Sequence, residues 1–175
     1  EQIVKSSVEE DVHIIGLSIL SGSHVELVGE IMKEMKKNKI DNIPVIVGGI
    51  IPSEDEKLLK SNGVKWDMIG MSLYPSYTTG GWQATNNLCL QNMNDMVARY
   101  NTPVMIAEIG MPWDNASEAK LFIQDLITKV KSVNGNNGLG VFYWEPESYN
   151  NWQGYSLGAF DNNGKPTIAL DPFLK

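Results

Sequence analysis

The stretch that decides the fold is Pro103-Val-Met-Ile-Ala-Glu-Ile-Gly110. Its first part, Val104 to Ala107, is a short uncharged apolar run, typical of a parallel strand that is covered on both faces. Glu108 follows this run directly, so its carboxylate is predicted to lie at the C-terminal edge of the strand. Open α/β sheets and (β/α) barrels carry their chemistry at that edge, because the loops that leave it converge. Glu108 is therefore a candidate catalytic residue, and the alternative is a glutamate hydrogen-bonded inside a turn.

The same kind of pattern predicts four more strands, each separated from the next by a helix. The strands are expected at residues 11–20, 44–49, 67–74 and 139–144, and the helices at 3–10, 25–38, 52–61, 85–100 and 116–133. Alternating strands and helices with right-handed crossovers give an α/β fold with a parallel sheet of about five βα units. Periodicity leaves two arrangements open, a partial (β/α)8-barrel-like sheet and a flavodoxin-like open sheet.

Composition narrows the classes of function. The chain has 175 residues, which favours one domain, and no apolar run long enough to span a bilayer. Its net charge of −7 argues against nucleic acid or a membrane surface as a partner. Cys89 is the single cysteine, and with only two histidines the sequence predicts no metal site. The polar, acidic start at Glu1 shows no signal peptide and suggests a sequence that begins inside a helix.

The aromatic residues are distributed unevenly. All five Trp, six Tyr and four Phe lie at or beyond Trp66. Residues 1–64 are rich in Lys, Glu, Ile and Val, whereas residues 65–175 are rich in Trp, Tyr, Asn and Gly. The border contains no linker, only a helix-to-strand turn with a glycine C-cap at Ser61-Asn-Gly-Val-Lys65. The sequence thus predicts two segments of different character within a single α/β domain over residues 1–175.

The first segment contains Asp11-Val-His-Ile-Ile-Gly-Leu-Ser-Ile-Leu20 and Ile43-Pro-Val-Ile-Val-Gly-Gly-Ile-Ile-Pro52. Over about residues 1–64 it resembles the cobalamin-binding domain of methylmalonyl-CoA-type mutases. The resemblance implies that a slot for the nucleotide tail of the cofactor is lined by Ser18, Leu20, Gly48 and Gly49. That family supplies a cobalt-ligating histidine from an Asp-x-His-x-x-Gly segment. His13, predicted inside a strand, and His24, predicted to begin a helix, lack that context, so tight cobalamin binding is not expected.

The second segment carries several motifs in order, at residues 62–75, 92–110, 140–146 and 159–166. They include Gly140-Val-Phe-Tyr-Trp-Glu-Pro146 and look like the last three βα units of the endo-β-1,4-galactanases, which are retaining glycoside hydrolases on a (β/α)8 barrel. The resemblance implies that Glu108 is the nucleophile. The acid/base of that family comes from an Asn-Glu pair on the fourth strand, and this sequence contains no Asn-Glu dipeptide.

Glu145 is the nearest substitute, because it is predicted to end the strand beside that of Glu108. Adjacent strands lie about 4.8 Å apart, and retaining glycosidases need their two carboxyl groups roughly 5 Å apart. In the galactanase family, however, this Trp-Glu-Pro glutamate is not the proton donor, so we expect a partly buried carboxylate beside the site. Candidate sugar-binding residues are Tyr74, Trp113, Glu145 and Trp152. Trp66 and Trp144 are expected to be buried, and Asp161-Asn-Asn-Gly164 to form a tight polar turn.

Three functional hypotheses follow. The first is an artificial chimera of two cobalamin-domain βα units and three galactanase units, without efficient catalysis. The second is a retaining endo-β-1,4-galactanase with Glu108 as nucleophile. The third is a module that binds galactan oligosaccharide or a cobalamin tail. Open sheet edges also predict a homodimer.

Overall fold

The computed structural model describes residues 2–19, 24–48, 58, 67–75 and 80–174. The chain divides into two compact units, Glu1–Met68 and Ile69–Lys175, and each unit has its own hydrophobic core. Their border lies close to the predicted change of character at residue 64. A single domain over residues 1–175 stays a prediction. Within the described residues, no helix has both the length and the apolar composition needed to cross a membrane.

The first unit is a pair of parallel strands packed against two helices. In chain order it contains α1 (Gln2–Glu9), β1 (Ile15–Ser18), α2 (His24–Lys37) and β2 (Val45–Gly48). Burial alternates along β1, and its buried side chains pack with those of both helices. The strand predicted over residues 11–20 is therefore shorter than expected and buried on one face only. The helix predicted over residues 52–61 lies outside the described residues, apart from Leu58.

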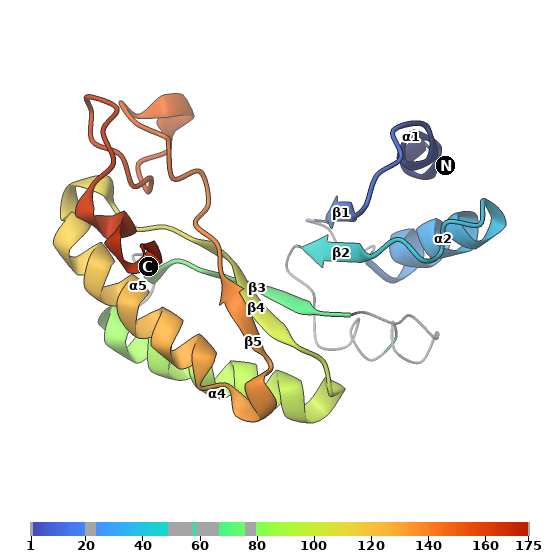
Figure 1. Cartoon of the computed structure of the whole chain (residues 1–175), viewed down its shortest axis with the longest axis horizontal. Helices are drawn as coiled ribbons and strands as arrows, with labels where there is room; N and C mark the ends of the chain where they lie inside the picture. Colours follow the sequence, from blue (N-terminus) through green and yellow to red (C-terminus); the bar gives the residue numbers. More distant parts are fainter. Residues whose placement is uncertain (1, 20–23, 49–57, 59–66, 76–79, 175) are drawn as a thin grey trace. The chain divides into compact units, whose positions relative to one another are not determined.

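The second unit is a three-stranded parallel sheet in the order β3-β4-β5. Its elements are β3 (Ile69–Leu73), α4 (Gly81–Tyr100), β4 (Val104–Ile109), α5 (Ala116–Lys131) and β5 (Gly138–Val141). Helices α4 and α5 lie along one side of this sheet (Figure 1). The α/β class with five parallel strands is confirmed, although the strands form two separate sheets in the described residues.

Short 3-10 helices complete the second unit. They are η2 (Trp113–Asn115), η3 (Asn134–Asn136), η4 (Trp152–Gly154) and η5 (Ile168–Phe173). The segment after β5 rises beyond the C-terminal end of the sheet before it returns to η5 (Figure 1). An ion pair between Lys120 Nζ and Asp171 Oδ2, at 2.7 Å, joins α5 to η5. The predicted loop-rich end with a short terminal helix is thus found.

Helix α5 supplies much of the second core. Its apolar residues recur every three or four positions and form one buried stripe, made of Ala119, Phe122, Ile123, Leu126 and Val130. Glu118 in the first turn and Lys129 in the last turn match the helix dipole. The stripe packs against Val104 and Ile106 of β4, so the central strand is fixed by the helix side of the sheet.

Two glycines of β5 predict opposite responses to the same substitution. A Cβ on Gly138 would overlap the backbone carbonyl of Val130, whereas a Cβ on Gly140 would meet nothing within 4 Å. We expect Gly138→Ala to lower the free energy of unfolding by roughly 2 kcal/mol or more, because backbone must move to relieve the overlap. Gly140→Ala is the matched control and should leave stability nearly unchanged. Urea denaturation measures both, and equal stabilities of the two variants would contradict this packing.

Candidate functional site

A β-bulge sets the position of Glu108. Met71 of β3 pairs with Ile106, but the next residue, Ser72, pairs with Glu108, so Ala107 is an extra residue in β4. Strict alternation would place Glu108 on the face of Val104 and Ile106, which are fully buried against the helices. The bulge instead turns Ile109 into that core. The half-buried Glu108 therefore lies on the opposite, open face of the sheet, close to the predicted strand end.

Tyr74 holds the carboxylate of Glu108. It follows β3 directly and donates a hydrogen bond from its hydroxyl to Glu108 Oε2 at 3.0 Å. The pKa of Tyr74 is raised well above its ordinary value by burial first, and then by the hydrogen bond to Glu108. Tyr74 consequently keeps its proton at neutral pH. The pair is a phenol that donates to a carboxylate at the C-terminal edge of two adjacent strands.

Gly110 and Tyr155 complete this cluster, and the sequence did not predict either. A Cβ on the buried Gly110 would lie 2.8 Å from Tyr155 Oη and 2.9 Å from Tyr74 Cε1, so only glycine lets the two rings approach the backbone. Tyr155 Oη also donates to the carbonyl oxygen of Trp144 at 3.2 Å. The quoted motif ends in Gly110, which is a weak signal. Tyr155 lies in an irregular loop, and no spacing in the sequence connects it to Glu108.

Tyr143 fastens the C-terminal loop to the end of β4. Its hydroxyl donates to the carbonyl oxygen of Leu157 at 3.0 Å and accepts a longer bond from the backbone N–H of Met111 at 3.4 Å. Burial raises the pKa of Tyr143 to about 12. The loop that carries Tyr155 is therefore anchored at the buried Leu157, two residues after Tyr155.

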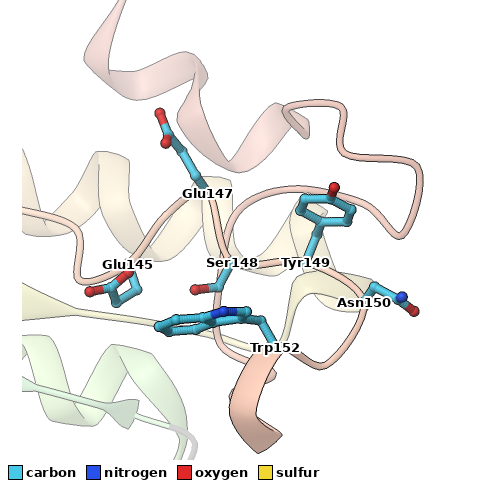
Figure 2. Close-up of a pocket in the computed structure, with 6 residues that line it drawn as sticks. All are labelled: Glu145, Glu147, Ser148, Tyr149, Asn150 and Trp152. Carbon is cyan, nitrogen blue, oxygen red and sulfur yellow. The ribbon is translucent and has the colours of Figure 1, made fainter.

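A second group of polar and aromatic residues lines an open pocket of about 380 Å³ in the C-terminal loop. The lining residues are Glu145, Glu147, Ser148, Tyr149, Asn150 and Trp152. Figure 2 shows Glu145 and Ser148 beside the indole of Trp152, whereas Glu147 and Asn150 point away from it. An exposed indole beside a carboxylate and a hydroxyl suits a sugar ring, which has one apolar face and polar edges.

Two predictions about this loop are wrong. Strand β5 ends at Val141, so Glu145 lies four residues beyond it, in a turn with a φ of 46°, and it is exposed rather than partly buried. Trp144 was expected to be buried, but 46% of it is exposed. Its backbone N–H still bonds to Ile109 O at 3.0 Å. Alternation with the half-buried Tyr143 explains the exposure, because Tyr143 packs against the helix-side core.

The other aromatic residues of the second segment fall in different environments. Trp152 is 51% exposed in η4, and Trp113 is half-buried in η2. Trp82 instead begins α4, packs against the core and donates from Nε1 to Glu118 Oε2 at 2.6 Å, which is a structural role. Trp66 and Tyr77 lie outside the described residues.

The predicted cofactor residues of the first unit are partly brought together. Ser18 and Gly48 are register partners at the C-terminal ends of β1 and β2, while Leu20 and Gly49 lie outside the described residues. His13 was predicted inside a strand, but it lies exposed in a bend before β1. The expectation that His13 lacks the family's motif is wrong for the pattern itself, because Asp11 to Gly16 do match Asp-x-His-x-x-Gly. At about 3.3 Å per residue, however, His13 is roughly 16 Å along the chain from Ser18. Since it lies at the opposite end of β1, His13 does not fit as a cobalt ligand for a slot at Ser18 and Gly48.

A larger hollow in the first unit is not the predicted cofactor slot. It measures about 940 Å³ and is lined by α2, residues 41–45 and Asp67. This places it beside the N-terminal end of β2, whereas ligands of parallel sheets bind at the C-terminal ends. Among the described residues, no three His, Cys, Asp or Glu side chains converge as a metal site requires.

The predicted polar turn at Asp161 is found. Asp161 Oδ1 accepts the backbone N–H groups of Asn163 at 2.8 Å and Lys165 at 2.9 Å. The bond from Lys165, and then that from Asn163, lowers the pKa of Asp161. Gly164 N also bonds to Asp161 O, which closes the turn.

Sequence comparisons assign both segments. The family model of glycosyl hydrolase family 53 matches residues 54–173. The chain belongs to glycosyl hydrolase family 53. The model of the B12 binding domain matches residues 1–72, so this family 53 chain also carries a B12-binding-domain segment. The two resemblances predicted from the motifs are confirmed, and the two matches overlap around the predicted border.

Individual relatives follow the same division. An ethylmalonyl-CoA mutase of Methylorubrum extorquens is 51% identical over 63 residues, which are 36% of this chain and 9% of the mutase. An uncharacterised Niallia circulans protein, named for the bgaB 5′ region, is 29% identical over 129 residues, 61% of this chain and 34% of that protein. A solved fungal β-1,4-galactanase matches 97% of this chain and 64% of its own, with a TM-score of 0.69 at 20% identity. It shares the (β/α) fold, and this chain spans less than two thirds of each of these proteins.

Removing the hydroxyl of Tyr143 tests the anchor of the C-terminal loop. Tyr143→Phe leaves the buried carbonyl of Leu157 without this donor, so we expect the free energy of unfolding to fall by about 1–2 kcal/mol. Tyr149→Phe is the matched control, because Tyr149 is 49% exposed in the same loop. Urea denaturation should show a loss for Tyr143→Phe alone, and equal losses would mean that the bond to Leu157 adds nothing.

The Asp161 turn predicts a pH-dependent contribution to stability. Because the pKa of Asp161 is lower in the folded chain, its contribution is present above the unfolded value of about 4 and is lost as the pH falls through the folded value. The stability difference between wild type and Asp161→Ala should therefore shrink from pH 7 toward strong acid. Asn162→Ala, in the same turn, should give a difference that does not change with pH. Denaturation at several pH values measures both, and a constant difference for Asp161→Ala would contradict the assignment.

Proposed function

We propose that this chain is an engineered chimera, in which a cobalamin-domain segment precedes a galactanase segment that keeps a glycosidase nucleophile without efficient hydrolysis of galactan. The two family matches support the chimera, and one observation carries the nucleophile. Glu108 is turned onto the open face of the sheet by the bulge at Ala107 and receives the hydroxyl of Tyr74, in the part of the chain that matches family 53. A carboxylate held by a neutral donor at a strand end is suited to attack an anomeric carbon.

The second carboxyl group of a retaining site has no counterpart that the sequence or the described residues identify. Hydrolysis of galactan requires an acid to protonate the leaving sugar oxygen, because an alkoxide leaves poorly. An aryl leaving group with a low pKa departs without that proton. Glu108 is therefore expected to react with activated aryl glycosides and not with galactan at a useful rate.

Galactan oligosaccharide is the proposed ligand class of the C-terminal loop. The proposal is supported by the family 53 match and by the pocket that contains Glu145 and Trp152, with Trp113 as a further contact. The flat face of an indole stacks on the apolar face of a sugar, and carboxylates accept from its hydroxyls. Tyr74, predicted as a sugar contact, donates to Glu108 and is not among the residues that line this pocket.

A complete retaining galactanase is the second candidate. It requires a partner chain, or further sequence, to bring a carboxyl group opposite Glu108. A binding module is the third, with Ser18 and Gly48 as contacts for a cobalamin tail. The placement of Ser18 beside Gly48 supports this third reading, and the position of His13 speaks against cobalt coordination.

Covalent labelling tests the proposed nucleophile. A 2-deoxy-2-fluoro-β-galactoside with a dinitrophenyl leaving group should add one glycosyl unit to the wild-type protein, detected by intact mass. Glu108→Gln should abolish the label, since an amide does not attack the anomeric carbon. Asp95→Asn is the control: its exposed ion pair with Arg99 on α4 contributes little to stability, and labelling should be unchanged.

Reducing-sugar release from β-1,4-galactan is measured on the same samples, together with the oligomeric state. The proposal expects labelling without release. Release that is lost in Glu108→Gln would favour the complete galactanase instead. A folded wild-type protein that takes no label would refute the nucleophile and leave the galactanase segment as scaffold.

A further inference from the structure

Three hydroxyl and carboxylate groups near the end of β4 form a chain of contacts. Tyr74 Oη donates to Glu108 Oε2 at 3.0 Å, and Tyr155 Oη donates to Trp144 O at 3.2 Å. The hydroxyl of Tyr155 and the ring of Tyr74 also lie next to each other at the backbone of Gly110. All of these groups lie in the second unit.

Counting protons shows what each group can do. Each phenol has one proton to donate, and the ionised carboxylate of Glu108 only accepts. While the proton of Tyr74 goes to Glu108, Tyr74 Oη can only accept from other groups. The proton of Tyr155 goes to the carbonyl oxygen of Trp144, which fixes the position of Tyr155. Tyr155 therefore restrains Tyr74 by packing against its ring and not by donating to its oxygen.

The backbone at Gly110 brings the two rings together. The ideal Cβ position of Gly110 is 2.8 Å from Tyr155 Oη and 2.9 Å from Tyr74 Cε1, so both rings rest on the same point of the chain two residues after Glu108. Leu157, buried two residues after Tyr155, is the third group near that position, at 3.1 Å. The loop that carries Tyr155 is therefore packed where it can restrict Tyr74.

We propose that Tyr155 is a positioning residue, which acts through Tyr74 to keep a hydrogen-bond donor aimed at the carboxylate of Glu108. This inference rests on the proposed nucleophile role of Glu108 for its effect on reaction rate, but not for its structural part. Tyr155 does not touch the reacting atoms in this assignment. In the covalent step Glu108 Oε bonds to the anomeric carbon, the bond to the aryl oxygen breaks, and the phenolate leaves with the electron pair.

The structural part is tested without any reaction. In protein labelled with ¹³C at tyrosine Cζ, the hydroxyl proton of Tyr74 should be observable by NMR, assigned by its loss in Tyr74→Phe. Tyr155→Phe removes the hydrogen bond to Trp144 O that fixes Tyr155 against Tyr74, so it should speed the exchange of this proton with water at least roughly tenfold. Tyr100→Phe, at the C-terminal end of α4, is the control and should leave the exchange rate unchanged.

Gly110→Ala is a second perturbation that keeps both hydroxyls. Its new Cβ must displace Tyr155 or Tyr74, so it should speed the exchange of the same proton. If Tyr155→Phe does not fold, as judged by urea denaturation, Gly110→Ala and Tyr155→His carry the test. An unchanged Tyr74 signal in a folded variant at either position would overturn the proposal, whether or not the protein has activity.

A double-mutant cycle separates positioning from general destabilisation. The rate of labelling by the fluorinated galactoside should fall about tenfold in Tyr155→Phe, the effect of one lost hydrogen bond. The same substitution should have no further effect in a Tyr74→Phe background. An equal fall in both backgrounds would mean that Tyr155 does not act through Tyr74. If the wild type takes no label at all, the nucleophile proposal fails, and the exchange measurement alone decides the role of Tyr155.

Discussion

The extra residue at Ala107 is the constraint on which the site depends. A strand whose even positions face the helices would bury Glu108 in an apolar core, where an unpaired carboxylate is costly. The bulge shifts the alternation of side chains along β4 by one residue, so that Ile109 lies in the core and Glu108 lies on the opposite face. Gly70 on the neighbouring strand makes this shift easy to accommodate, because a Cβ there would lie 3.2 Å from the Cβ of Ala107. Core and site are thus built by the same six-residue strand.

The geometry around Glu108 is completed by residues far away in the sequence. Tyr74 comes from the end of β3, and Tyr155 from a loop 47 residues after Glu108 (155 minus 108). That loop is held by the hydrogen bond of Tyr143. It also packs closely at Gly158, where an added Cβ would overlap the backbone of Ser148. The loop also contains several non-glycine residues in the left-handed region, so its conformation is set by tertiary contacts rather than by local preference.

How much of this the sequence could predict depends on the range of the forces involved. The βα order, the helix face of α5 and the turn at Asp161 follow from local patterns, and they were predicted. The bulge was not, because Ala107 looks like one more apolar position in the run and only the register with β3 reveals it. The exposure of Trp144 was missed because the sequence does not show where β5 ends, and that end decides which face of the sheet Trp144 occupies. No local sequence pattern predicts the contact of Tyr155 with Tyr74 and Gly110.

Several large apolar side chains lie exposed on the open face of the second unit. Leu139, Phe142 and Trp144, which lie on or just after the edge strand β5, are 55%, 62% and 46% exposed. In a closed (β/α) barrel the corresponding face is filled by side chains from all strands. By contrast, among the described residues each helix-side core is formed by side chains of its own unit, 69–175 in one case and 1–68 in the other. The face of the second unit opposite this core is the one on which Glu108 lies.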